Sequence, residues 1–135
     1  MTVLTGIMAP KILLIDDEPL MHLLYKGHIE KAGYILLTAK NAEEGLAIVK
    51  AEKPVLVVID IIMTGKDGLA ALRDLKSSNE TSKIPVIVFT GSITDAHHAT
   101  RKEAATAGAA VFLTKPISPA QLLNEIKRLA PTTVA

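Results

Sequence analysis

A short apolar run that ends in an aspartate constrains the fold of this chain more than any other stretch. Residues 55–60 read Val-Leu-Val-Val-Ile-Asp, with no polar side chain before Asp60. Five aliphatic residues are too few for a helix and are typical of a strand buried on both faces of a parallel sheet. Asp60 then falls at the carboxyl end of this strand, the edge where open parallel sheets bind ligands. A lone aspartate there could also simply cap the following turn.

The composition limits the class of protein. With 135 residues, 49% of them hydrophobic, we expect one globular domain at 11–130, a leader at 1–10 and a tail at 131–135. A net charge of +1 gives no basic field for nucleic acid. The lack of cysteine excludes disulfides, thiolate zinc sites and thiol catalysis. Because there is no secretory signal and no apolar run of about 18 residues, we expect a cytoplasmic protein without membrane contact.

Four more runs have the character of buried strands, and helical patterns alternate with all five runs. The expected strands are residues 11–15, 34–38, 55–60, 86–89 and 109–113. The expected helices begin near residues 18, 42, 69, 94 and 119. Asp17 is suited to cap the first helix, while Asn41 with Glu44 and Ser118 with Gln121 form capping-box patterns.

Strands that alternate with helices predict an α/β fold, a parallel sheet covered on both faces. Crossovers in such sheets are right-handed almost without exception, which leaves few topologies. We expect a doubly wound five-stranded sheet in the order 2-1-3-4-5 with five helices, whose switch point lies between strands 1 and 3. Those strands end in Asp16-Asp17 and in Asp60. Three carboxylates are therefore expected at one edge of the sheet.

This edge has the chemistry of a phosphoryl-transfer site. Carboxylates this close repel one another unless a hard divalent cation such as Mg²⁺ neutralises them. Strands 4 and 5 end beside the same pocket and bring Thr90 and Lys115. A hydroxyl and an ammonium group that face a carboxylate–metal cluster suit a phosphoryl group. The pattern predicts that Asp60 attacks phosphorus while Lys115 and Thr90 hold the phosphoryl oxygens.

Each of these residues also has an ordinary structural interpretation. Asp16 and Asp17 could cap a helix, Thr90 could belong to a turn, and Lys115 could be a surface lysine. Phe112 could pack in the core, and the adjacent histidines His97 and His98 are interpreted as surface residues. What favours a functional interpretation is that the candidates all fall at strand carboxyl ends.

Four motifs stand in a particular order along the chain. They are Ile-Asp-Asp-Glu-Pro at 15–19, Val-Ile-Asp-Ile-Ile-Met at 58–63 with Asp67-Gly68, Phe-Thr-Gly at 89–91, and Phe-Leu-Thr-Lys-Pro at 112–116. In this order and spacing they resemble the receiver domains of two-component response regulators, and the match runs from Lys11 to about Leu129. The resemblance implies a flavodoxin-like fold similar to that of the chemotaxis regulators.

The resemblance implies roles for particular residues. Asp60 would be phosphorylated by a histidine kinase or phosphotransfer protein. Asp17 and Asp60 would bind Mg²⁺ directly, Asp16 would act largely through water, and the backbone carbonyl of Ile62 would be a further ligand. Because the Ile62 side chain cannot orient a water molecule, slow hydrolysis of the aspartyl phosphate is expected.

The resemblance also implies a conformational switch. Thr90 would move towards the phosphoryl group, and Phe112 would turn inward. The face made by helix 4, strand 5 and helix 5 would then be recognised by a partner protein rather than by nucleic acid. Two residues depart from the family pattern, Thr64 in place of a proline and Phe112 in place of a tyrosine. The Lys115–Pro116 peptide bond is expected to be cis.

Three other interpretations compete with a stand-alone receiver. A haloacid-dehalogenase-type phosphohydrolase also uses an aspartyl nucleophile, but it needs a second aspartate where this chain has Ile62. A degenerate receiver would be expected to have lost part of the acidic triad, which is intact here. A receiver cut from a hybrid kinase or multidomain regulator would look the same. We expect a signalling switch that phosphorylates and dephosphorylates itself, rather than a turnover enzyme.

Overall fold

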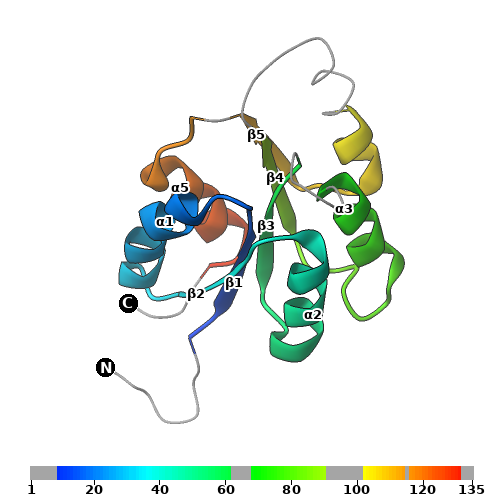
Figure 1. Ribbon diagram of the computed structural model, residues 1–135, viewed down its shortest axis with the longest axis horizontal. Helices are drawn as coiled ribbons and strands as arrows, with labels where there is room; N and C mark the ends of the chain where they lie inside the picture. The colour runs from blue at the N-terminus through cyan, green and yellow to red at the C-terminus, as the bar shows by residue number, and fades with distance from the viewer. Residues whose placement is uncertain (1–8, 62–67, 91–101, 115, 132–135) are drawn as a thin grey trace.

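The sheet at the centre of the molecule is parallel and has the expected strand order. The computed structural model describes residues 9–61, 68–90, 102–114 and 116–131. Five strands pair in the order β2-β1-β3-β4-β5 (Figure 1). Their bounds are β1 Lys11–Ile15, β2 Ile35–Ala39, β3 Leu56–Asp60, β4 Val86–Thr90 and β5 Val111–Thr114. The predicted fold class is therefore confirmed.

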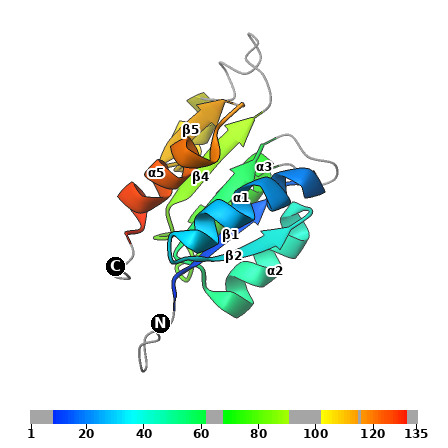
Figure 2. The same ribbon diagram turned by 90° about the vertical axis from the view of Figure 1, so that its left-hand side faces the viewer.

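Helices cover both faces of the sheet. Their bounds are α1 Pro19–Lys31, α2 Ala42–Glu52, α3 Gly68–Ser77 and α5 Pro119–Leu129, and residues 102–107 are also helical. Helices α1 and α5 lie on one face, while α2, α3 and residues 102–107 lie on the other (Figures 1 and 2). The start expected for the fourth helix, near Thr94, lies outside the described residues. None of the helices in the described ranges is long and apolar enough to cross a membrane.

The central strand is as buried as its sequence predicts. All five residues of β3 are buried, and Asp60 is its last residue. Val55 lies before the strand and is 42% exposed, so the strand starts one residue later than the apolar run. The core consists of two layers, one on each face, because alternate strand residues point to opposite sides of the sheet.

Two further strands, β2 and β5, also begin later than predicted, and in both the preceding helix end uses a residue assigned to the strand. Tyr34 donates its backbone N–H to Ile29 at the end of α1, so β2 begins at Ile35. Ala109 likewise donates to Ala104, after Gly108 has taken a φ of 107°. These bonds close a helix end around a left-handed glycine, so the N–H groups of Tyr34 and Ala109 do not donate to a neighbouring strand. The next N–H, that of Ala110, donates to Val86 O at 2.9 Å, one residue before β5 begins.

The two tyrosines donate hydrogen bonds to the backbone at the two ends of α5. The Tyr25 hydroxyl donates to the carbonyl of Ile117 at 2.9 Å, just before the helix. The Tyr34 hydroxyl donates to the carbonyl of Ala130 at 2.7 Å, just after it. Both rings are fully or almost fully buried, so each hydroxyl satisfies a buried carbonyl.

The helix caps match the sequence patterns only in part. Ser118 and Gln121 make both bonds of a capping box on α5. Asn41 accepts from Glu44 N at 2.8 Å, but the Glu44 carboxylate accepts from Lys40 rather than from Asn41. The prediction that Asp17 caps α1 is wrong.

Glu18 is the N-cap residue of α1, and its side chain makes no capping bond. Pro19, as the first helical residue, has no N–H to be capped. Asp17 therefore lies one residue before the cap position, and its carboxylate lies near those of Asp16 and Asp60.

Candidate functional site

Four carboxylates converge at the carboxyl edge of the sheet. One carboxylate oxygen from each of Asp16, Asp17, Glu18 and Asp60 lies within 4.8 Å of the others. Asp16 and Asp60 are buried at 0% and 4% exposure, Asp17 is half-buried, and Glu18 is exposed. The structure thus brings together the three predicted aspartates and adds Glu18. The signal for Glu18 was its place directly after Asp16-Asp17.

The backbone that carries the two buried carboxylates is held by the sheet. Strands β1 and β3 pair in parallel, with Ile15 opposite Ile59. Asp16 N donates to Ala39 O at 3.0 Å, and Ile61 N donates to Phe89 O at 3.0 Å. Ladder bonds therefore continue up to Asp16 and past Asp60, which makes their positions rigid.

A glycine lets helix α3 approach this edge. Gly68 N donates to the carbonyl of Ile61 at 3.1 Å. A side chain at position 68 would meet the backbone oxygen of Asp60 and the Cα of Ile61. Only a residue without Cβ fits here, so α3 begins directly against the end of β3.

The donor set fits a hard divalent cation. Ionised carboxylates at this spacing repel one another, and their mutual repulsion opposes folding unless positive charge is placed between them. Carboxylate oxygens are the ligands that Mg²⁺ prefers, and Mg²⁺ commonly uses one or two of them together with water. The cluster supplies such oxygens from the buried side chains of Asp16 and Asp60 and from the more exposed side chain of Asp17.

The other predicted site residues are described only in part. Thr90 is the last residue of β4 and lies opposite Thr114 of β5, so its backbone is at the same edge. Its side chain, together with Ile62, Thr64 and Lys115, lies outside the described residues. Phe112 is half-buried and packs against the core layer on the side of α2 and α3. The core-packing interpretation of Phe112 is thus confirmed in part.

The fold and this cluster define a class of protein, and the class agrees with sequence comparison. The profile of the response regulator receiver domain matches residues 12–127, so the chain belongs to this family. It is a receiver domain of two-component signalling, a family of signalling switches. Receiver domains generally bind Mg²⁺ at their acidic pocket, and they interact with histidine kinases and downstream targets.

Two curated relatives illustrate the range of the family. The chain is 37% identical over 116 residues to the protein PilH of Pseudomonas aeruginosa, covering 86% of this chain and 93% of PilH. It is 30% identical over 122 residues to the phosphate regulon transcriptional regulatory protein PhoB of the same organism. That match covers 90% of this chain but only 52% of PhoB. Several other relatives are likewise about twice as long as the matched region.

Solved structures share the fold. The Vibrio cholerae chemotaxis protein CheY4 superposes with a TM-score of 0.82 at 22% identity, over 90% of this chain and 99% of CheY4. The receiver domain of a signal transduction histidine kinase from Syntrophus aciditrophicus gives a TM-score of 0.81 at 30% identity, over 90% and 89% of the two chains.

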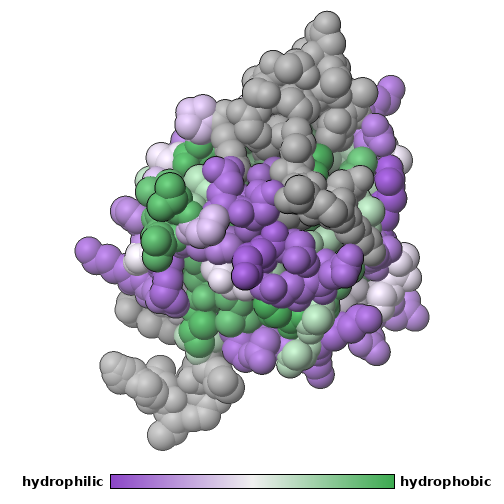
Figure 3. Space-filling view, viewed as in Figure 1, coloured by the Kyte–Doolittle hydropathy of each residue, from purple (hydrophilic) through white to green (hydrophobic). Residues whose placement is uncertain are grey.

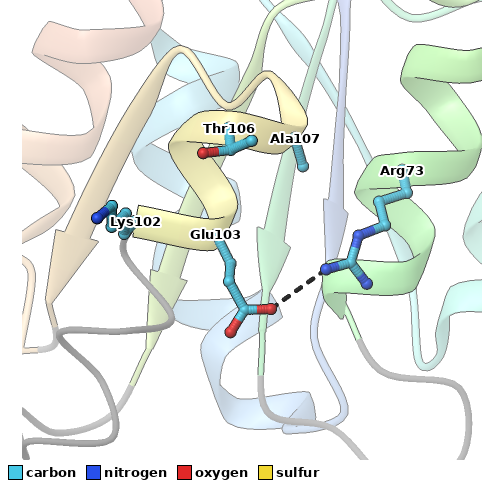
Figure 4. A pocket seen from close by; sticks show the side chains of 5 residues that line it. All are labelled: Arg73, Lys102, Glu103, Thr106 and Ala107. Carbon is cyan, nitrogen blue, oxygen red and sulfur yellow. Dashed lines mark hydrogen bonds and ion pairs between the residues drawn. The ribbon is translucent and has the colours of Figure 1, made fainter.

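A hollow lies between α3 and residues 102–107. Its volume is about 580 Å³, and it is lined by Arg73, Lys102, Glu103, Thr106 and Ala107 (Figure 4). Arg73 Nη2 and Glu103 Oε2 lie 3.2 Å apart across it. An exposed ion pair thus connects α3 to the segment 102–107.

Proposed function

We propose that Asp60 is the residue that accepts the phosphoryl group in this receiver domain. The observation that carries the proposal is the carboxylate of Asp60, 4% exposed at the end of β3 and grouped with three further carboxylates. The donor would be a phosphohistidine of a kinase or phosphotransfer protein, as in the family. We propose a cytoplasmic location, where such a donor would be met.

The transfer is an in-line displacement at phosphorus. A carboxylate oxygen of Asp60 forms the new O–P bond as the N–P bond to the donor histidine breaks, and the imidazole leaves with its electron pair and takes up a proton. Asp17, Asp60 and the backbone carbonyl of Ile62 would hold Mg²⁺ directly, and Asp16 would act through water. The bound ion would supply positive charge to the phosphoryl oxygens. Lys115 and Thr90 would hold the remaining oxygens, since ammonium and hydroxyl groups donate hydrogen bonds to them.

The output would leave through the face made by the fourth helix, β5 and α5. Phe112 lies on β5 within this face and is half-buried, and it would turn inward when Asp60 is phosphorylated. A partner protein rather than nucleic acid would recognise the face, since the net charge of +1 offers no basic field.

Ile62 in place of a second aspartate argues against phosphohydrolase turnover. The slow hydrolysis expected from Ile62 can be checked by comparing the decay of the phosphorylated wild type with that of Ile62→Asn.

An apolar ridge on α1 supports a protein donor. Leu20, Leu23 and Leu24 are 77%, 71% and 47% exposed in the first turns of α1, directly after the acidic cluster. Figure 3 shows hydrophobic side chains on the surface over this helix. A protein donor that docks over the first turns of α1 would bury this ridge, and an interface confined to it would be small and transient. Leu23→Gln should therefore slow transfer from a protein donor and leave labelling by acetyl phosphate unchanged.

The test of the acceptor uses a small phosphodonor. Acetyl phosphate with Mg²⁺ should label the wild-type chain once, as measured by intact-protein and peptide mass spectrometry. Asp60→Asn should lose the label, because the amide is a poor nucleophile. The matched control is Asp74→Asn, which changes an exposed aspartate on α3. Full labelling of Asp60→Asn would overturn the proposal.

A further inference from the structure

A histidine of α1 binds the backbone of the acidic cluster. His22 Nε2 lies 2.8 Å from the backbone oxygen of Asp16. A carbonyl oxygen can only accept, so Nε2 carries the hydrogen, and it does so whether the ring is neutral or protonated. The side chain is half-buried in the second turn of the helix. The hydrogen bond therefore connects α1 to the end of β1.

Asp16 is held at each of its polar groups. Its N–H donates to Ala39 O at 3.0 Å, and its Oδ1 accepts from Glu18 N at 2.9 Å. The third bond, from His22 to the carbonyl, fixes the plane of the Asp16–Asp17 peptide. Because that plane sets the direction in which the Asp17 side chain leaves the backbone, His22 acts on a carboxylate that it does not touch.

We propose that His22 is a positioning residue for the acidic cluster. It holds the Asp16–Asp17 peptide so that both carboxylates face Asp60, and so it raises the affinity of the cluster for Mg²⁺. The inference rests on the proposed function, since the same carboxylates serve both. Groups that orient metal ligands without binding the metal typically contribute about 10–100-fold to affinity or activity.

The experiment measures Mg²⁺ binding by calorimetry, without any phosphodonor. His22→Phe keeps a ring but removes the donor, and we expect its affinity to fall about 10-fold. His22→Gln places an amide N–H at similar reach and should recover most of the loss. The matched control is His28→Phe, which changes an exposed histidine about 1.7 turns further along α1 and should bind as the wild type does.

A second readout separates positioning from a merely structural role. Melting in EDTA reports the stability of each variant without metal. Labelling by acetyl phosphate is then compared at limiting and saturating Mg²⁺, and the deficit of His22→Phe should shrink at saturation. If His22→Phe does not fold, His22→Leu takes its place.

The possible outcomes are distinct. If the wild type binds Mg²⁺ and His22→Phe binds it equally well, the positioning role is overturned while the proposed function stands. The same holds if His22→Gln is as weak as His22→Phe, because the donor is then irrelevant. If the wild type itself binds no Mg²⁺, the proposed metal site and this inference fail together.

Discussion

Gly68 is the residue through which helix α3 reaches the acidic edge. Its missing Cβ leaves room for the carbonyl of Asp60 and the backbone of Ile61. Gly27, in the middle of α1, has nothing within 4 Å of the position of a Cβ. The two glycines therefore differ in environment while both are helical, and they form a natural pair for experiment.

We expect Gly68→Ala to destabilise the fold by about 1–3 kcal/mol, because a methyl group forces the backbone at the end of β3 to shift. Gly27→Ala should stabilise it by about 0.5–1 kcal/mol, the usual gain of alanine over glycine inside a helix. Urea unfolding of both variants is the measurement. Stabilisation by Gly68→Ala would show that α3 can move away from Asp60 at no cost.

Lys76 is expected to make the stability of the fold depend on pH in the alkaline range. Its Nζ donates to the carbonyls of Ser82 at 3.0 Å and Ile84 at 2.7 Å. Burial lowers the pKa of Lys76 below its ordinary value of 10.5. Between the lowered pKa and 10.5 the unfolded chain binds more protons than the folded one, so the contribution of Lys76 to stability rises with pH.

The expected result is a difference between two proteins. The unfolding free energy of the wild type minus that of Lys76→Met should increase as the pH approaches 10.5, since all other groups cancel in the difference. Chemical denaturation over a series of alkaline buffers provides the values. A difference that decreases with pH would mean that the two carbonyl acceptors favour the ammonium more than burial opposes it.

At the scale of elements, the capping box of α5 is the contact most open to measurement. Ser118 Oγ accepts from Gln121 N at 3.1 Å, and Gln121 Oε1 accepts from Ser118 N at 2.9 Å. Ser118→Ala should cost about 0.5–2 kcal/mol, because it leaves an N–H of the first turn without its acceptor. Thermal or urea unfolding measures this, and Gln121→Ala in a double-mutant cycle shows whether the two bonds are coupled.

The sequence predicts the elements well and their ends less well, for a physical reason. Buried strands such as β3 are visible as uninterrupted apolar runs, because both of their faces pack. The starts of β2 and β5 depend on whether Tyr34 and Ala109 donate to a helix or to a ladder. That choice is made by backbone geometry around a glycine, which side-chain patterns do not record.

The same limit applies to the site. Asp16, Asp17 and Asp60 could be predicted, because the carboxyl ends of neighbouring parallel strands must meet. Glu18 is exposed and joins the cluster only through the turn before α1, so periodicity gives no signal for it. The bond from His22 connects residues six positions apart across a loop and a helix start, and it could be found only in the structure.

At the scale of the whole molecule, the hollow beside α3 is crossed by the Arg73–Glu103 ion pair. Both side chains are more than half exposed, at 56% and 53%. A double-mutant cycle with Arg73→Gln and Glu103→Gln should give a coupling of about 0.2–1 kcal/mol that decreases with added salt. A coupling of zero at low salt would mean that α3 and residues 102–107 are held together by packing alone.

The two tyrosines that hold α5 have an optical consequence. The chain contains two tyrosines and no tryptophan, and both hydroxyls bind the carbonyls that flank this one helix. Its near-ultraviolet spectrum therefore arises largely from the joint between α5 and the rest of the domain. Detachment of that helix would be visible without any added dye, as a loss of tyrosine circular dichroism. An unlabelled sample in an ordinary cuvette can thus report whether this joint stays closed when Asp60 is phosphorylated.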